Sequence, residues 1–376
     1  MSLITSSPGK YVWVIGAILI NLVKLPLLLL YYQPKFTRPH HEWTIRQSVL
    51  NHVMNSFLFH TAYVEAVTPL DLRPGSFRDR FVPIPVGPNS LYTGVLKADP
   101  AIAPCPTGAI WYPETPARAR ADEDKPVILH FHPGGYAMGD VRSDGTFAAR
   151  LLTDRVRSQA LLSLYRLASN QNGRFPAALQ DGLSAYHYLL TELSIPASQI
   201  VLSGDSAGGH IVICMLRYLT EHSSEIGLPA PKAALLWSPA INLMASVDPS
   251  TITESRNYAK DYLDPTFITW GARRFVSNVP GCSAYMNPLD AAFKSPCPIW
   301  AFCGGNEVFH DEIAGWVQQM KAVPENEVAL RVERLANHDI FFAGNLTGWK
   351  AEAEDAADDA RRWLERLLQR RAYKEL

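Results

Sequence analysis

The sequence predicts an α/β protein whose mainly parallel central sheet is covered by helices on both faces. Short buried strands alternate with amphipathic helices along most of the chain, the pattern of a parallel sheet with helical crossovers. The strongest local signal is Gly204-x-Ser206-x-Gly208, which follows an apolar strand at 199–203 and precedes an apolar helix at 207–222. The 376 residues and the net charge of -1 fit one large domain or two small ones and give no reason to expect a nucleic-acid partner.

An apolar run at residues 11–32 is long enough to cross a bilayer and carries aromatic residues at both ends. Lys24 and Pro26 interrupt the run. A central lysine costs about 3 kcal/mol on the insertion scale, whereas each of the 13 Leu, Ile and Val residues returns about 0.3–0.6 kcal/mol. We therefore expect a transmembrane or membrane-anchor helix after a tail at 1–10. The alternative is a helix that lies in the membrane interface or is buried against the domain.

The side of the membrane on which the catalytic domain lies is not determined. More basic residues follow the apolar run than precede it, which favours a cytoplasmic domain. A glycosylation sequon at 345–347, with Asn345 as acceptor, is usable only in a lumenal domain. We therefore predict a single-pass membrane protein, and the endoplasmic reticulum is one candidate for its membrane.

The hydrophobic pattern divides the rest of the chain into cap helices at 33–70 and a catalytic domain at 71–376, with a cap insertion near 241–295. An apolar stripe marks the helix at 44–66, which fits either a core-facing helix or a cap helix over a pocket. Asp264 before a proline predicts the N-cap of a helix within the insertion. Strands are expected at 80–86, 108–112, 126–132, 160–165, 199–203, 233–238, 298–303 and 328–334, and further helices at 176–193, 207–222, 265–276, 312–323 and 350–371.

A serine in a strand–turn–helix is a nucleophile only if a positioned base accepts its proton. Four histidines follow Ser206 in the chain: His210, His222, His310 and His338. His210 and His222 lie on the helix that leaves the turn, so neither ring is expected to reach back to the serine. His338 lies just past the last predicted strand, in a loop at the sheet edge where a base can reach the serine. It is our candidate for the general base.

The acid that orients this histidine should follow the strand at 298–303, because the expected chain order is serine, acid, histidine. Glu307 comes first in that loop and Asp311 lies one turn later. Asp311 fits equally well as a first-turn charge of the following helix. We favour Glu307 as the acid and keep Asp311 as the alternative.

Backbone N–H groups are needed to stabilise a developing oxyanion. The loop that begins at His132 follows the strand expected beside the nucleophile strand. Pro133 has no N–H, so Gly134 and Gly135 must supply the donors from this loop. Ala207, directly after the serine, supplies the third. His132 is expected to brace the loop.

The five cysteines are too few and too scattered for a disulfide framework, and only Cys105 and Cys282 could pair, in an oxidising compartment. No Cys/His cluster has zinc spacing. We expect no metal and no cofactor.

Together these segments resemble the hormone-sensitive-lipase-like branch of the α/β-hydrolases, over about residues 107–345. The motifs that carry the resemblance are His-Pro-Gly-Gly-Tyr, Tyr-Arg-Leu-Ala, Phe-Pro-Ala-Ala-Leu-Gln-Asp, Gly-Asp-Ser-Ala-Gly-Gly, Asn-Glu-Val-Phe-His-Asp-Glu and Asn-His-Asp, in this order. The resemblance implies an α/β-hydrolase fold and a Ser–acid–His esterase, with a helical cap built partly from N-terminal sequence.

The resemblance also assigns roles: Ser206, Glu307 and His338 to the triad, and Gly134, Gly135 and Ala207 to the oxyanion hole. Two residues depart from the family pattern. Pro133 replaces the usual first glycine, whose N–H is not a needed donor. Glu307 replaces the commoner aspartate, so the acid is the least secure member of the triad.

With its apolar N-terminal segment, the chain also resembles fungal membrane-bound members of the branch, including steryl acetyl hydrolases. These similarities predict a membrane-associated carboxyl-ester hydrolase whose substrate is a lipophilic ester with a short acyl group, such as an acetylated sterol or terpenoid. An amide, formamide or thioester hydrolase with the same triad is the alternative. A ligand-binding protein on this fold is disfavoured, because His338 and the oxyanion loop are both present.

Overall fold

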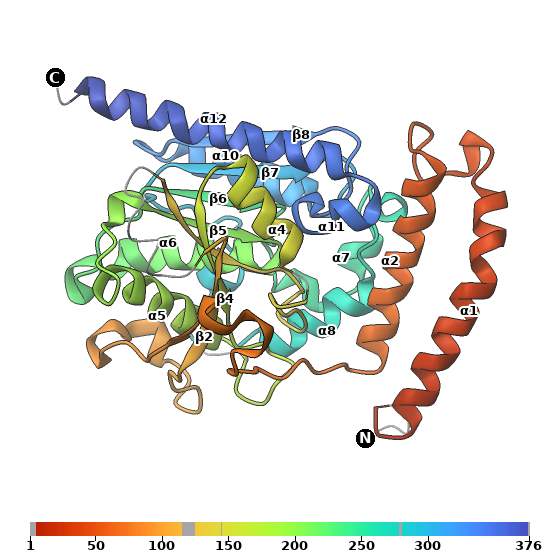
Figure 1. Ribbon diagram of the computed structural model, residues 1–376, viewed down its shortest axis with the longest axis horizontal. Helices are drawn as coiled ribbons and strands as arrows, with labels where there is room; N and C mark the ends of the chain where they lie inside the picture. Colours follow the sequence, from red (N-terminus) through yellow and green to blue (C-terminus); the bar gives the residue numbers. More distant parts are fainter. Residues whose placement is uncertain (1–4, 115–124, 144, 278–279, 375–376) are drawn as a thin grey trace.

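The central element of the structure is an eight-stranded sheet (Figure 1). The computed structural model describes residues 5–114, 125–143, 145–277 and 280–374. Within them the strands lie in the order β1-β2-β4-β3-β5-β6-β7-β8. β2 is antiparallel to both of its neighbours, whereas all pairs from β4 to β8 are parallel. The strands are β1 (Phe81–Ile84), β2 (Thr107–Tyr112), β3 (Val127–Phe131), β4 (Gln159–Leu164), β5 (Ile200–Asp205), β6 (Ala233–Trp237), β7 (Ile299–Gly304) and β8 (Val328–Glu333).

Helices cover both faces of this sheet, as the sequence predicts. Successive strand residues point to opposite faces, so each face has its own apolar core. Leu129 and Leu202 pack on one face with α5, α6 and α10, and Ile128 and Val201 pack on the other with α4 and α12. The helices are α1 (Gly9–Tyr31), α2 (Ile45–Tyr63), α4 (Thr146–Arg150), α5 (Ala177–Thr191), α6 (Ala207–Ile226), α7 (Ser250–Thr253), α8 (Pro265–Phe275), α9 (Ser283–Met286), α10 (His310–Ala322), α11 (Ile340–Thr347) and α12 (Lys350–Lys374).

The structure differs from the expected elements at several places, among them the short helices α7 and α9, which are not predicted. β1 is shorter than predicted, because Pro85 has no N–H to donate to the ladder. α4, with its π-helical continuation Leu151–Arg155, and α11 are not predicted. α4 is only five residues long, and α11 is apolar on most sides, so neither carries a helical period. The predicted N-cap at Asp264 is confirmed, since its carboxylate accepts the N–H groups of Thr266 and Phe267.

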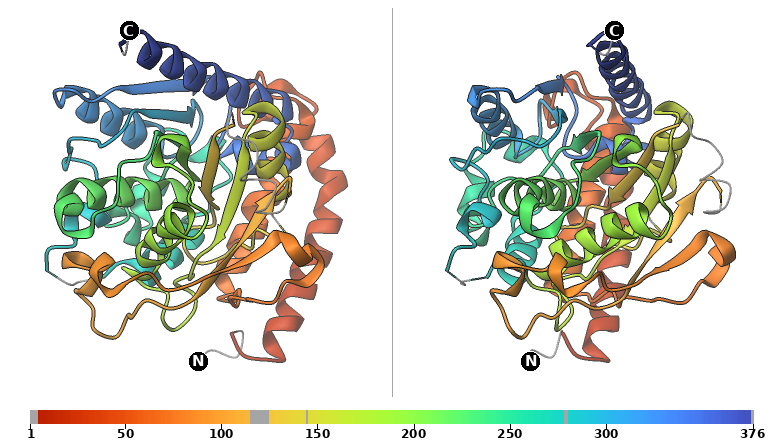
Figure 2. Two further views of the ribbon diagram at one scale, coloured as in Figure 1. Left: turned by 60° about the vertical axis from the view of Figure 1, so that its left-hand side comes forward. Right: turned by 90° about the vertical axis from the view of Figure 1, so that its left-hand side faces the viewer.

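The N-terminal helix α1 lies along one side of the molecule, antiparallel to α2 (Figures 1 and 2). It is 23 residues long, with a mean hydropathy of 2.2, and Ala17 is its one buried residue. Among the described residues, α1 is the one helix long and apolar enough to cross a membrane, a property that it shares with signal sequences.

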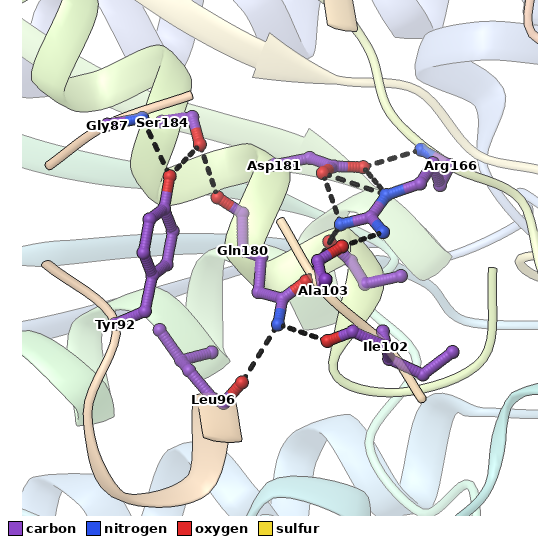
Figure 3. Close-up of polar contacts among 10 residues, drawn as sticks. Gly87, Tyr92, Leu96, Ile102, Ala103, Arg166, Gln180, Asp181 and Ser184 are labelled. Atoms are coloured by element: carbon purple, nitrogen blue, oxygen red, sulfur yellow. Dashed lines mark hydrogen bonds and ion pairs between the residues drawn. The ribbon is translucent and has the colours of Figure 1, made fainter. Parts of the chain in front are cut away.

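A buried polar network ties the segment before β2 to α5 (Figure 3). The Arg166 guanidinium donates to the Asp181 carboxylate at 2.7 Å and to the carbonyl oxygen of Ala103 at 2.8 Å. Gln180 Nε2 donates to the carbonyl oxygen of Ile102 at 2.9 Å. Burial raises the pKa of Asp181, whereas the guanidinium lowers it. The Tyr-Arg-Leu-Ala and Gln-Asp motifs therefore fasten the first strands of the sheet to the helix layer.

Candidate active site

Ser206 occupies the sharp turn between β5 and α6. Its backbone has φ 50° and ψ -114°, a strained conformation for a residue with a Cβ. A Cβ on Gly204 would lie 2.2 Å from the carbonyl oxygen of Gly208, and a Cβ on Gly208 would lie 1.9 Å from that of Phe131. Glycine at both places lets the strand and the helix meet closely, which fixes Ser206 at the carboxyl edge of the sheet.

Three side chains from three different strand ends form one hydrogen-bonded chain. Nε2 of His338 lies 3.0 Å from Oγ of Ser206, and Nδ1 lies 2.9 Å from Oε2 of Glu307. All three residues are buried: Ser206 is 6% exposed, His338 is 2% exposed and Glu307 is 0% exposed. The structure thus brings together the residues nominated as nucleophile, base and acid.

Glu307, and not Asp311, contacts the histidine. Asp311 lies in the first turn of α10, where its carboxylate is 67% exposed and pairs with Arg256 at 2.7 Å. Oε1 of Glu307 accepts the Gly304 N–H at 3.2 Å. The Ser238 hydroxyl, which accepts the backbone N–H of Asp339 at 3.1 Å, lowers the pKa of the Glu307 carboxyl.

The surroundings of the pair favour a neutral imidazole facing Ser206. Burial lowers the pKa of His338, and the negative charges of Asp261 and Asp339 partly restore it. Burial also raises the pKa of Glu307 to about 8, and the nearby donor groups and the charge of His310 offset only part of that rise. The Glu307 oxygen requires the imidazole proton on Nδ1, so Nε2 is the atom available to accept the serine proton.

The loop expected to supply oxyanion donors lies beside Ser206. β3, which precedes it, pairs directly with β5, as predicted. Gly134 and Gly135 have φ values of 112° and 58°, and both line the same cavity as Ser206 and His338. A Cβ on Gly134 would lie 2.1 Å from the carbonyl oxygen of Met138. The N–H of Ala207 begins α6 directly behind the serine.

His132 lies at the base of this loop. Its ring stacks on Tyr165 with 4.4 Å between ring centroids, and its Nδ1 lies 2.7 Å from the carbonyl oxygen of Pro133. A Cβ on Gly139 would lie 2.6 Å from the same ring, so the loop closes tightly around it. These contacts suit the bracing role expected of His132.

Asp261 is a site residue that the sequence analysis missed. One carboxylate oxygen accepts the Val308 N–H at 2.7 Å, and the other accepts the His338 N–H at 3.2 Å and the Tyr262 N–H at 2.7 Å. Asp261 is 4% exposed, and burial raises its pKa to about 6. It therefore ties the acid loop to the histidine loop.

A cavity of about 210 Å³ lies above Ser206. Its walls come largely from α2, α8 and α11, so α2 packs on the core and also faces the nucleophile. Apolar side chains form most of its lining: Met54, Phe57, Leu58, Met138, Leu263, Phe267, Ile268, Phe342, Ala343 and Leu346.

The other residues singled out in the sequence lie outside this cavity. His210 is bonded to the Tyr136 hydroxyl at 2.7 Å, and His310 lies 2.8 Å from the Asp311 carboxylate. Asn345 is exposed on α11. All five cysteines are free thiols, with Cys105 partly buried and Cys282 buried.

The sheet order, the turn at Ser206 and the three-residue hydrogen-bonded chain define the class of α/β-hydrolase-fold proteins. The chain belongs to the alpha/beta hydrolase fold family, whose profile matches residues 128–342. This membership confirms the predicted fold. An esterase of the bacterial hormone-sensitive lipase family has a similar fold, with a TM-score of 0.61 and 21% identity over 86% of this chain and 99% of that one.

Several curated proteins match by sequence, including these three relatives. An acetyl-hydrolase from Streptomyces hygroscopicus is 28% identical over 51% of this chain and 60% of its own length. The esterase LipI from Mycobacterium tuberculosis is 31% identical over 39% of this chain and 43% of its own length. Versiconal hemiacetal acetate esterase from Aspergillus parasiticus is 37% identical over 26% of this chain and 29% of its own length. The match thus spans less than two thirds of each relative.

Proposed function

We propose that this chain is a serine carboxyl-ester hydrolase, with Ser206 as nucleophile, His338 as general base and Glu307 as the orienting acid. The observation that carries the proposal is the continuous chain from Ser206 Oγ through the imidazole to the Glu307 carboxylate, with separations of 3.0 and 2.9 Å. A serine, a base in hydrogen-bond reach and a buried orienting carboxylate are the parts that acyl transfer needs.

The reaction proceeds in two halves. Ser206 Oγ attacks the ester carbonyl carbon while its proton passes to Nε2 of His338, and the carbonyl oxygen becomes an oxyanion that accepts the N–H groups of Gly134, Gly135 and Ala207. The carbon–oxygen bond to the alcohol then breaks, and the alcohol takes the proton from His338. Water then attacks the acyl-enzyme carbonyl carbon and gives one proton to His338. The bond from that carbon to Ser206 Oγ breaks, His338 returns the proton to Oγ, and the carboxylic acid leaves.

The substrate proposed is a lipophilic ester with a short acyl group. The small apolar cavity over Ser206 supports this, and so do the names of two relatives, an acetyl-hydrolase and an acetate esterase. An acetylated sterol or terpenoid is the finer proposal. α2 and the 241–295 insertion act as its cap, and α1 attaches the protein to a membrane.

The test is the substitution Ser206→Ala, with Ser224→Ala on the exposed side of α6 as the matched control. We expect Ser206→Ala to lower kcat/KM for p-nitrophenyl acetate by about 10³-fold or more without loss of helical circular dichroism. Retained hydrolysis by the folded variant would show that Ser206 is not the nucleophile. Rates on phenyl acetate and acetanilide then separate an esterase from an amidase with the same triad.

A further inference from the structure

A second cavity, of about 450 Å³, lies in a groove between α1 and α2. Its lining is almost wholly apolar. One face of α1 supplies one wall at helical spacing, with Val14, Ala17, Ile18, Leu22 and Leu25, and α2 supplies the opposite wall.

The two walls of the groove are held together near one end. Trp13 Nε1 donates to Nδ1 of His60 at 3.2 Å, and the Trp13 ring stacks on Tyr63 with 4.5 Å between centroids. These contacts dock α1 on the cap helix by its first turns. The two helices lie side by side and antiparallel (Figures 1 and 2), and the cavity lies between their facing side chains.

Phe57 joins this groove to the active site. Its side chain lines the groove, and it also lines the cavity that contains Ser206 and His338. The Phe57 side chain is 51% exposed, so surrounding side chains do not enclose its ring. One half-exposed aromatic ring therefore forms a wall common to both cavities.

We propose that the groove between α1 and α2 binds the apolar portion of the ester substrate, a long alkyl chain or fused-ring skeleton whose ester group reaches Ser206 past Phe57. The inference rests on the proposed esterase function and adds where the lipophilic part lies. The two cavities share Phe57 as a wall, so a movement of this half-exposed ring would connect them. An apolar ligand gains roughly 25 cal/mol for each Å² of apolar surface that such walls remove from water.

The first test locates the chain of a bound ligand, independently of turnover. Full-length Ser206→Ala protein in detergent is irradiated with hexadecyl acetate that carries a diazirine at the far end of its chain, and labelled peptides are mapped by mass spectrometry. We expect labels on the residues that line the groove, at positions 14, 17, 18, 21, 22 and 25 of α1 or at 53, 57, 60 and 61 of α2. Labels confined to α8 or to the outward residues 12, 19 and 23 of α1 would overturn the proposal.

The second test compares neighbouring residues of α1. Ile18 and Leu19 are 55% and 57% exposed, but only Ile18 lines the groove. We expect Ile18→Trp to lower the ratio of kcat/KM for hexadecyl acetate to that for ethyl acetate by about tenfold, since an indole fills the groove. Leu19→Trp should change this ratio less than twofold.

Equal ratios in the two variants would contradict the groove proposal. If the wild-type protein hydrolyses no ester at all, the proposed function fails instead, and the photolabelling result alone decides whether the groove binds the chain.

Discussion

Asp261 accepts hydrogen bonds from the two loops that carry the acid and the base. We expect Asp261→Asn to lower kcat about tenfold with little change in KM, because the amide directs an N–H group at one of these donors. Its lost charge should also shift the acid limb of the pH profile to lower pH, since Asp261 raises the pKa of His338.

Asp264→Asn is the matched control for this variant, because Asp264 caps α8 and contacts neither loop through that cap. It should cost at most about 1 kcal/mol of stability and leave the pH profile in place. A normal pH profile and normal kcat in Asp261→Asn would show that Asp261 is not a positioning residue.

The base itself predicts a second pH effect. Protonated His338 cannot accept the serine proton, and burial lowers its pKa from the usual 6.5. The neutral, active form therefore persists to lower pH than for an ordinary histidine. In kcat/KM measured against pH with an uncharged ester, we expect an acid limb with an apparent pKa below 6.5. A midpoint at or above 6.5 would be inconsistent with a buried base.

A site residue can be predicted from the sequence when it directly follows a predicted strand. Ser206, Glu307 and His338 each follow a parallel strand, and the carboxyl ends of such strands meet at one sheet edge, so order and spacing nominate them. Asp261 follows no strand, and its partners lie 47 and 77 residues away. Its role follows only from the folded structure, in which the 241–295 segment packs against the loops that carry Glu307 and His338.

At the scale of elements, the turn at Ser206 requires close contact between β5, α6 and the neighbouring β3. Gly208→Ala would place a Cβ 1.9 Å from the carbonyl oxygen of Phe131, so we expect destabilisation by about 3 kcal/mol or more. Gly315→Ala in α10 is the control, with Leu289 as its nearest contact at 3.7 Å. It should be neutral or stabilising by up to about 1 kcal/mol.

Thermal unfolding of the two variants checks this expectation. Similar melting temperatures for Gly208→Ala and Gly315→Ala would mean that the turn does not need its glycine.

The elements also show what hydrophobic periodicity can predict. All eight strands are expected, because each is an apolar run bounded by turn residues, although β8 at the sheet edge is only partly buried. The stripe on α2 leaves its role open, since a helix that packs on the core and lines a cavity has the same apolar pattern as a core helix. α11 is missed because Ile340, Phe341, Ala343, Gly344 and Thr347 are buried on several sides of it.

At the scale of the whole molecule, α1 lies beside α2 and keeps most of its apolar side chains exposed. Its 23 residues give a length of about 34 Å, enough for the roughly 30 Å hydrocarbon core of a bilayer. If α1 is in or on a membrane, the groove and the active-site cap face the lipid, which suits a lipophilic substrate.

We expect the full-length chain to pellet with membranes and to resist carbonate extraction. Leu19→Asp together with Val23→Asp, on the outward face of α1, should release it, because each charge costs about 3 kcal/mol in the hydrocarbon core. Phe36→Asp, an exposed position beyond α1, is the control. A soluble wild-type chain, or equal pelleting of all three proteins, would contradict membrane attachment by α1.

The central claim is that His338 activates Ser206 as a nucleophile. Treatment with a fluorophosphonate, followed by intact-mass analysis and peptide mapping, tests this claim most directly. We predict one adduct, on Ser206, formed about 100-fold or more slowly in His338→Ala. The absence of an adduct, an adduct on another serine, or an unchanged rate in His338→Ala would contradict the claim.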